Sequence, residues 1–369
     1  MYKTIEELVT RVDERNSDGT VSELIGVSID KCFIKSVANT NGTDLSKYKI
    51  IRKNDFAVSL MQVSRDGKIP VARLEEYEEA IMSPAYPIFR VKDKNIILPE
   101  YLEMWFKRPE FDREAAFIAV GGVRGSMPWE EFAKMKLPVP PIEKQRKIVN
   151  AYKIVTDRIA LKQKINDNLL DSVQAIFRSW FVDYAPFDGV CPSNWKTGCV
   201  EDIAEFFDSM RKPLSSLERA DMERIYPYYG AVSIVDYVDD YIFDGEYLLV
   251  SEDGIYVVDE NGHPLIQHIS GKFWANNHAH ILKGKSGFNE DSLYLFLANT
   301  NMAPIVTGAA QPKINQANLK SFPITIPDSE TMLKFNNIIQ PFFDQRLTNE
   351  SEIKKLEALQ SLLLTRLVD

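Results

Sequence analysis

All four histidines of this chain fall between His263 and His280. His278 and His280 are two residues apart, so they would point to the same face of an extended segment. Imidazoles placed in this way could hold zinc, but a zinc site needs three or four ligands, and no cysteine lies near them. We therefore predict that the chain binds no metal. The alternative interpretation places Asn276, Asn277 and His278 at the rim of a small barrel, where they contact base edges or satisfy a turn.

Common catalytic motifs are missing from the sequence, which has no GxxxxGK(S/T) phosphate loop, no GxSxG elbow and no strand-linked GxGxxG. The glycine-rich residues 119–125 predict a tight loop, which could approach a phosphate closely because glycine has no side chain. Residues 183–187 resemble the Asn-Pro-Pro-Tyr/Phe signature of amino methyltransferases only in part, since the Asn and the first Pro are absent. We interpret them as the end of a helix and expect a chain without catalytic activity of its own.

Two long helical segments must position whatever the chain recognises. In each of them, residues spaced alternately by four and three form a seam, and the two seams lie 187 positions apart in the same register. Each seam would stay in water without a partner, so we expect the two helices to pair. The first seam comprises Ile148, Tyr152, Val155, Ile159, Leu169, Val173, Ile176 and Trp180, and the second comprises Phe335, Ile339, Phe342, Ile353, Leu356, Leu363 and Leu367.

Polar residues occupy the middle of both seams, where the sequence places Lys162, Asn166, Arg346 and Asn349. Either the seam opens to water at mid-length, or buried polar groups fix the register of the two helices at some cost in stability. Antiparallel packing superposes the two polar middles, so both interpretations favour it. Pro341 removes a backbone donor inside the second helix and predicts a kink or a restart near Gln340.

The repeat divides the chain into four segments: globular residues 1–142, a helical arm at 143–185, globular residues 186–329 and a second arm at 330–369. Each globular segment shows short strands and few helices, which predicts an α+β fold with a pseudo-two-fold internal repeat. Short helices are expected at residues 99–107 and 291–298. Strands at residues 241–250 and 255–269 are expected to turn at Asp244-Gly245 and at Asn261-Gly262.

The charge of the chain, −9 at pH 7, argues against a uniformly basic nucleic-acid binder. Residues 182–329 contain 10 Lys and Arg against 21 Asp and Glu, but the acids crowd residues 236–260, which leaves a one-sided basic face open. The three cysteines show no disulfide or metal spacing, the N-terminus lacks a secretory pattern, and no apolar run approaches a membrane span. We expect a cytoplasmic protein with reduced thiols.

Several runs resemble one protein family. Residues 138–187, PVPPIEKQRKIVNAYKIVTDRIALKQKINDNLLDSVQAIFRSWFVDYAPF, resemble the central helical region of specificity subunits of type I restriction-modification systems. YPYYGA at 226–231, YIFDGEY at 241–247 and GKFWANNH at 271–278 resemble the target-recognition domains of the same family. The resemblance implies two mainly-β target-recognition domains, each reading half of a split DNA sequence. They would be separated by two antiparallel coiled-coil helices that set the number of unread bases.

The resemblance also implies the partners. The chain would join two methyltransferase subunits and the restriction/translocase subunits, and S-adenosylmethionine, ATP and magnesium would bind to those partners and not to this chain. Base readout requires donors and acceptors at the groove edges, with Lys and Arg on flanking phosphates. Our candidate DNA contacts are Arg65, Lys68, Arg124 and Ser126 in the first domain, and Arg211, Lys212, Tyr228, Lys272, Asn276, Gln311 and Lys313 in the second.

Two other functional classes stay open on the sequence alone. The acidic second half supports a coiled-coil scaffold that binds proteins and has no sequence readout of its own. An autonomous enzyme would need activity from the purified chain with nucleotide, metal or S-adenosylmethionine, and we predict none.

Overall fold

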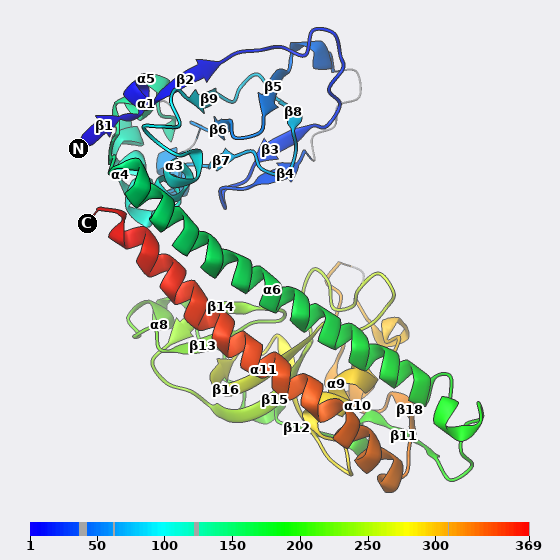
Figure 1. The fold of residues 1–369 in the computed structure, drawn as a ribbon. Coiled ribbons are helices and arrows are strands. Elements are labelled where there is room, and N and C mark those ends of the chain that lie inside the picture. Colours follow the sequence, from blue (N-terminus) through cyan, green and yellow to red (C-terminus); the bar gives the residue numbers. More distant parts are fainter. Residues whose placement is uncertain (37–42, 62, 122–124, 309, 369) are drawn as a thin grey trace. The chain divides into compact units, whose positions relative to one another are not determined.

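The computed structural model describes residues 1–36, 43–61, 63–121, 125–308 and 310–368 (Figure 1). The chain forms two compact units: unit 1 is Met1–Lys162 with Ser351–Asp369, and unit 2 is Gln163–Glu350. Two long helices, α6 (Ile142–Phe181) and α11 (Ser329–Thr365), each contribute one part to either unit. The boundary between the units therefore passes through both helices, whereas the four segments expected from the sequence kept the helices apart from the globular parts.

Unit 1 is built from small antiparallel sheets and short helices. Its four-stranded sheet has the order β2 (Val9–Val12), β9 (Ile88–Val91), β6 (Phe56–Val58), β7 (Val71–Arg73). Three strand pairs accompany it: β1 (Tyr2–Thr4) with β10 (Lys136–Pro138), β3 (Ile25–Val27) with β4 (Phe33–Lys35), and β5 (Lys49–Arg52) with β8 (Glu79–Met82). The helices are α1 (Ile5–Leu8), α2 (Val63–Asp66), α3 (Pro99–Phe106), α4 (Pro109–Ile118) and α5 (Trp129–Lys134), with 3-10 turns η1 (Leu45–Lys47), η2 (Ala119–Gly121) and η7 (Arg366–Val368).

Unit 2 contains a larger sheet with the strand order β12 (Ala204–Phe206), β17 (Ala279–Gly284), β15 (Phe243–Ser251), β16 (Ile266–Ala275), β13 (Tyr226–Tyr229), β14 (Ile234–Val238). Its neighbours are antiparallel except β13 and β16, which run parallel. A separate pair joins β11 (Lys196–Cys199) to β18 (Pro323–Ile326). The helices are α7 (Val200–Ile203), α8 (Ser216–Ala220), α9 (Glu290–Ala298) and α10 (Gln316–Lys320), with 3-10 turns η4 (Ala185–Phe187), η5 (Asp208–Met210) and η6 (Ala303–Ile305).

The two units repeat one local plan, strand, short helix, strand, at the start of each globular part. In unit 1 the order is β1, α1, β2, and in unit 2 it is β11, α7, β12. The same backbone bond closes each copy: Ile5 N donates to Met135 O at 3.0 Å, and Val200 N donates to Phe322 O at 3.1 Å. The predicted α+β class and internal repeat are confirmed.

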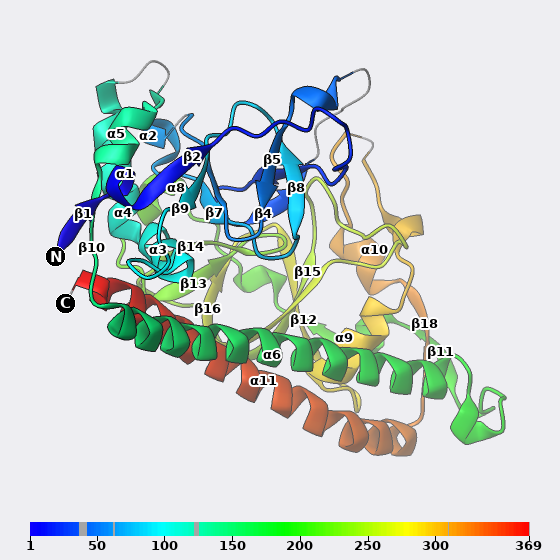
Figure 2. The ribbon, with the colours of Figure 1, turned by 45° about the horizontal axis from the view of Figure 1, so that its top comes forward.

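The helices α6 and α11 run side by side in each unit (Figure 1 and Figure 2). In unit 1 the Lys162 Nζ lies 2.9 Å from Glu352 Oε2, and Gln360 donates to the Thr156 hydroxyl at 2.8 Å. In unit 2 the ring centroid of Phe335 lies 5.7 Å from that of Trp180, and Asn349 Nδ2 donates to Asn166 Oδ1 at 2.8 Å. In both units, residues with lower numbers on α6 face residues with higher numbers on α11, so the two helices pair antiparallel.

The seam residues expected from the sequence are all buried or half-buried. Of the two interpretations of the polar middle, the structure supports paired polar groups, because Asn349 is only 1% exposed and bonds to Asn166. The ends of the seam do more than join the two helices. Leu364 and Leu367 belong to the core of unit 1, and Phe177 belongs to the core of unit 2. Each end of the helix pair is therefore part of a globular core.

One local expectation is wrong, and another is wrong in one of its two alternatives. Asp244-Gly245 makes no turn, because β15 continues through it and pairs Gly245 with Gly271 on β16. Both glycines have positive φ, 123° and 96°, and the ladder continues through them without reversing. Of the kink or restart expected near Gln340, the restart is absent, since α11 is one helix across Pro341. Pro341 itself is exposed, while its neighbours in the seam stay buried in the core.

Other local expectations are confirmed. The helix expected at residues 99–107 is α3, and the helix expected at 291–298 is α9. The turn at Asn261-Gly262 is present, with a φ of 84° at Gly262 and a bridge between Val258 and Pro264. None of the helices in the described part of the chain combines the length and the apolar character needed to cross a bilayer.

Unit 2 holds a buried carboxyl group in the first turn of α9. Asp291 is 4% exposed, and burial, followed by the negative charges of Glu246 and Asp344, raises its pKa to about 7. The imidazole of His268 lies 3.5 Å from this carboxyl, and burial, with the charge of Arg346, lowers the pKa of His268 to about 4. A raised acid pKa means that the folded state holds this proton more tightly than the unfolded chain does.

Asp291→Asn is therefore expected to stabilise unit 2 in a pH-dependent way. The folded state loses stability as pH rises from the unfolded pKa of Asp, near 4, to the folded pKa near 7, and the Asn variant escapes that loss. The gain should grow between about pH 4 and 7 and level off above, reaching on the order of 4 kcal/mol, since each pKa unit corresponds to about 1.4 kcal/mol. Thermal unfolding at a series of pH values measures it. Asp239→Asn, at an exposed position, is the control, and an equal gain at every pH would contradict the prediction.

Candidate nucleic-acid interface

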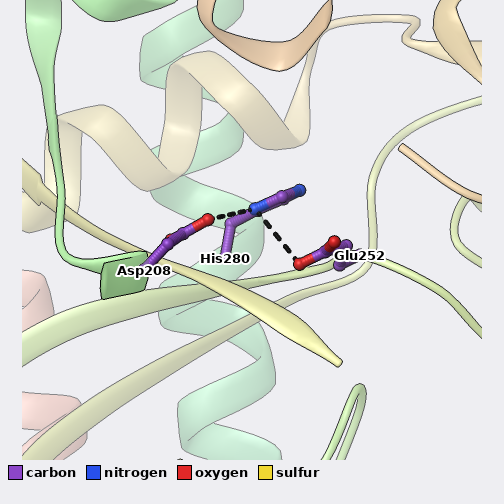
Figure 3. Close-up of side chains that lie close together, drawn as sticks. All are labelled: Asp208, Glu252 and His280. Atoms are coloured by element: carbon purple, nitrogen blue, oxygen red, sulfur yellow. Dashed lines mark hydrogen bonds and ion pairs between the residues drawn. The ribbon is translucent and has the colours of Figure 1, made fainter. Parts of the chain in front are cut away.

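A buried histidine in unit 2 gathers loops that are far apart in the sequence. His280, on β17, is fully buried, and its Nδ1 lies 2.7 Å from Asp208 Oδ2 at the start of η5. Its Nε2 donates to Ile314 O at 2.8 Å, because a carbonyl oxygen can only accept. Glu252 Oε2, just after β15, is 3.6 Å from the same Nδ1, and Figure 3 shows both contacts meeting at this nitrogen.

Two basic side chains complete this cluster. The Arg211 guanidinium lies 2.5 Å from Glu252 Oε2 and donates to Ala279 O at 2.7 Å and to Asn277 O at 3.4 Å. Lys313 Nζ lies 2.9 Å from Glu252 Oε1. We call Asp208, Arg211, Glu252, His280 and Lys313 the His280 network.

The carboxylates of the His280 network are held in the charged form. Burial alone would raise the pKa of Glu252, but hydrogen bonds from Arg211 and Lys313 outweigh it and keep the pKa below its usual range. Burial would also raise the pKa of Asp208, but the hydrogen bond with His280 outweighs burial, and the pKa is lowered. These loops are therefore joined by ionic hydrogen bonds in a partly desolvated place, where such bonds are stronger than in water.

The same cluster has the spacing of a metal site. Ligand atoms of Asp208, Glu252 and His280 lie within 4.8 Å of one another. Arg211 and Lys313, however, already place positive charge on these carboxylates, and His280 Nε2 is committed to a carbonyl. A metal ion would have to displace both kinds of contact, so the prediction that the chain binds no metal stands as a prediction.

The turn at residues 276–278, after β16, is hydrogen-bonded to Arg211 and Glu252 of the His280 network. Asn276 is 9% exposed, its N–H donates to Tyr229 O at 3.0 Å, and its Oδ1 accepts from His278 N at 2.8 Å. Asn277 and His278 are exposed. His278 Nδ1 lies 2.6 Å from Asp253 Oδ1. The backbone of the turn is held from inside, and two polar side chains face outward.

The structure places two of the candidate DNA contacts inside unit 2. Tyr228 is 2% exposed, and its hydroxyl accepts a hydrogen bond from Leu214 N at 2.9 Å. The Arg211 side chain is 14% exposed and ion-paired as described above. Both have a structural role here, because neither presents its polar group to solvent. Residue type suggested them as contacts, but the sequence does not show which polar groups the fold buries.

Apart from Asn276, the remaining candidates of unit 2 stay accessible. Gln311 is exposed, and the Lys313 side chain is 45% exposed in the same loop. Lys272 is exposed, with its Nζ 4.3 Å from the ring centroid of Tyr241. Lys212 is exposed and lies near the Trp274 ring. The structure thus places Lys313 in the His280 network and Asn276 in the adjoining turn at residues 276–278, whereas Lys272 lies on β16 beside Tyr241.

Unit 1 presents an equivalent loop. Met127 N donates to Leu60 O at 2.8 Å, as Ile314 N donates to Glu252 O at 2.8 Å in unit 2. Gly125, with a φ of 73°, packs against α2, since a Cβ there would lie 2.5 Å from Ser64 Oγ.

The same Cβ would lie 3.4 Å from Arg65 N, so Gly125, next to Ser126, packs on the backbone of Arg65. The Arg65 side chain is 65% exposed and paired with Asp66. Lys68 lies just beyond α2, 3.8 Å from Asp30 Oδ1. Arg124 lies outside the described residues.

Comparison with known proteins gives consistent results. A family model described as type I restriction modification DNA specificity domain matches residues 23–171 and again residues 192–359. The chain is 39% identical over 133 residues to a putative type I restriction enzyme specificity subunit, S.HindORF215P of Haemophilus influenzae, across 36% of this chain and 33% of that protein. It is 23% identical over 300 residues to the type I restriction enzyme MjaIX specificity subunit of Methanocaldococcus jannaschii, across 74% of this chain and 69% of that protein.

A solved structure shares the fold. The S subunit of a type I restriction-modification system from M. genitalium superposes with a TM-score of 0.56 at 14% identity, covering 100% of this chain and 96% of that one. At this identity the likeness concerns the fold alone.

Proposed function

The chain belongs to the family of type I restriction-modification specificity subunits, and from this membership we propose that each unit reads one half of a bipartite DNA target. The observation that carries the proposal is that the family model matches twice, once in each repeat. The equivalent loops of the two repeats differ in chemistry, with Leu60 and Ser126 in unit 1 against Glu252 and Lys313 in unit 2. Different loop chemistry would let the two halves of the target differ in sequence.

We assign the spacer to the helix pair. At about 1.5 Å per residue, the 40 residues of α6 measure roughly 60 Å, more than the ~34 Å of one turn of DNA. Its antiparallel pairing with α11 is supported in each unit by apolar seam residues and by paired polar groups. The same pair would dock two methyltransferase subunits.

We assign the chemistry to the partners. Adenine methylation requires the target base to leave the stack, and the methyltransferase subunit would do this. S-adenosylmethionine, ATP and magnesium would bind to the methyltransferase and the restriction/translocase subunits. This chain would locate the base without acting on it.

A competition experiment tests the proposed function. The chain assembled with its methyltransferase partner should bind one bipartite sequence at least ~10³-fold more tightly than scrambled DNA at physiological salt. Methylome sequencing of cells with and without the chain would identify that sequence. If the assembled complex prefers no bipartite site, the protein-binding scaffold suggested by the acidic second half is the better description.

A further inference from the structure

We infer that the turn at residues 276–278 is the base-reading edge of unit 2, and that the His280 network holds this edge in place. The inference rests on the proposed function and deepens it, because it names the groups that read and the groups that position them. Asn277 and His278 would contact an amine-bearing base edge, the N6 amine of adenine or the N4 amine of cytosine, in the major groove. Arg211 and His280 would act as positioning residues.

The first support is the way the turn is anchored. Arg211 donates to the carbonyl oxygens of Asn277 and Ala279, on both sides of His278. Asn276 closes the turn from within by accepting from His278 N. Glu252 N donates to His278 O at 2.9 Å, which ties the turn to the end of β15. A recognition segment fixed before binding loses less entropy when it meets its ligand.

The second support is the chemistry of the exposed side chains. A carboxylate only accepts, so the proton of neutral His278 lies on Nδ1 and is donated to Asp253. The other ring nitrogen, Nε2, is then an acceptor, suited to the exocyclic amine of adenine or cytosine. Asn277 can both accept and donate, as in the bidentate contact of an Asn with adenine.

The third support is the local charge, which disfavours a phosphate as the ligand of this turn. Asp253 lies directly beside His278, and Glu252 precedes it. The Arg211 guanidinium beside the turn and the Lys313 ammonium are both already paired with Glu252. Carboxylates beside the turn repel a phosphate, whereas an amine donor meets no such repulsion.

The fourth support is a contrast between the units. In unit 2, Leu248 pairs with Leu282 and Val250 with His280. The matching ladder of unit 1 pairs Phe56 with Phe89, which puts Pro87 in the place of His280.

Leu60 of unit 1 likewise stands where unit 2 has Glu252, as the equivalent bonds to Met127 and Ile314 show. Among the residues of unit 1 that the structure describes, the His280 network therefore has no counterpart, and its loss should affect only one half of the target.

The experiment uses the chain assembled with its methyltransferase partner and a set of targets with every base pair of both half-sites substituted in turn. Asn277→Ala and His278→Ala should each reduce discrimination about 10-fold or more at one or two adjacent base pairs of one half-site. The other half-site and the spacer should be unaffected. His263→Ala removes a histidine that also contacts an aspartate, Asp259 at 3.3 Å, and is the matched control with no expected change.

Positioning is tested separately with Arg211. Arg211→Ala should reduce discrimination at the same base pairs as His278→Ala. Arg211→Lys should restore part of that discrimination, and both variants should read the other half-site normally. If Arg211→Ala unfolds unit 2, Arg211→Lys alone supplies the measurement, with reduced discrimination at those base pairs as the expected result. A purely structural Arg211 would change unfolding temperature without any base-pair selectivity, and that outcome would overturn its positioning role.

The outcomes separate the inference from the proposed function. If the unaltered complex reads a bipartite site but Asn277→Ala and His278→Ala leave every base preference unchanged, the inference fails and the proposed function stands. If His278→Ala weakens binding equally for all sequences and lowers the salt dependence, the turn contacts phosphate and the inference also fails. An unaltered complex that prefers no bipartite site would remove both.

Discussion

Phe335→Ala is expected to destabilise unit 2 by about 3–5 kcal/mol. Phe335 is fully buried at the meeting point of α11, α6 and the globular core. Its ring centroid lies 4.7 Å from that of Phe181 and 5.7 Å from that of Trp180. Removing the ring leaves a cavity that these large neighbours cannot fill by small movements, so both the transfer and the cavity contributions are lost.

Urea unfolding of the unaltered chain and of the Phe335→Ala variant measures this loss of stability. Leu333→Ala is the matched control, because it lies on the same helix with 61% of its surface exposed and should change the free energy of unfolding by less than about 0.5 kcal/mol. Equal effects of the two substitutions would show that this end of α11 does not pack as described.

Inserting one heptad into each helix, beside Asn166 in α6 and beside Asn349 in α11, is expected to change the target without changing either half-site. Seven residues lengthen a helix by about 10 Å, the rise of about three base pairs. A full heptad keeps the apolar seam on the same face, so the two helices can still pair. The preferred gap between the half-sites should grow by about three base pairs, and binding to the original target should fall toward the nonspecific level, a loss on the order of 10³-fold.

Competition between DNA libraries that differ only in the gap measures the change. A heptad inserted in α6 alone is the control, because it shifts the seams out of register and should weaken binding to every gap. An altered half-site sequence with an unchanged gap would contradict the assignment of the spacer to the helix pair.

The helix pair could be predicted from the sequence because its signal is both local and repeated. Steps of four and three fix which side of a helix is apolar, and the two copies share one register. The strict pattern still missed Phe177 and Phe343, which are more buried than their seam neighbours Ile176 and Phe342 because each end of the pair also packs on a globular core.

The failed local predictions have a common cause. Asp244-Gly245 is a turn signal over two residues, but the register of β15 and β16 places Gly245 opposite Gly271, and the long ladder prevails over the local preference. Pro341 removes one backbone hydrogen bond from the helix. The side chains of Ile339 and Phe343 on either side are buried, and their packing stabilises the helix across Pro341.

The candidate interface could be predicted only in part. Residue type near resembling motifs suggests Asn276, Gln311 and Lys313, of which Lys313 belongs to the His280 network and Asn276 to the adjoining turn. Asp208 and Glu252 gave no signal, because 72 and 28 positions separate them from His280 and only the sheet brings them together. The sequence does not show burial either, so residue type alone suggests Tyr228 as a DNA contact although the folded chain buries it.

The division of the chain inside α6 and α11 decides how chimeras of this protein should be cut. Phe177 and Phe335 are interior residues of the same body as the large sheet of unit 2, and Leu364 is an interior residue of unit 1. A globular part exchanged at the loops near residues 142 and 186 would lack the stretches of α6 and α11 that pack in its core. Junctions placed beside Asn166 and Asn349 would keep each globular part together with the helical stretches that pack in its core. Hybrids joined there should fold with native cooperativity.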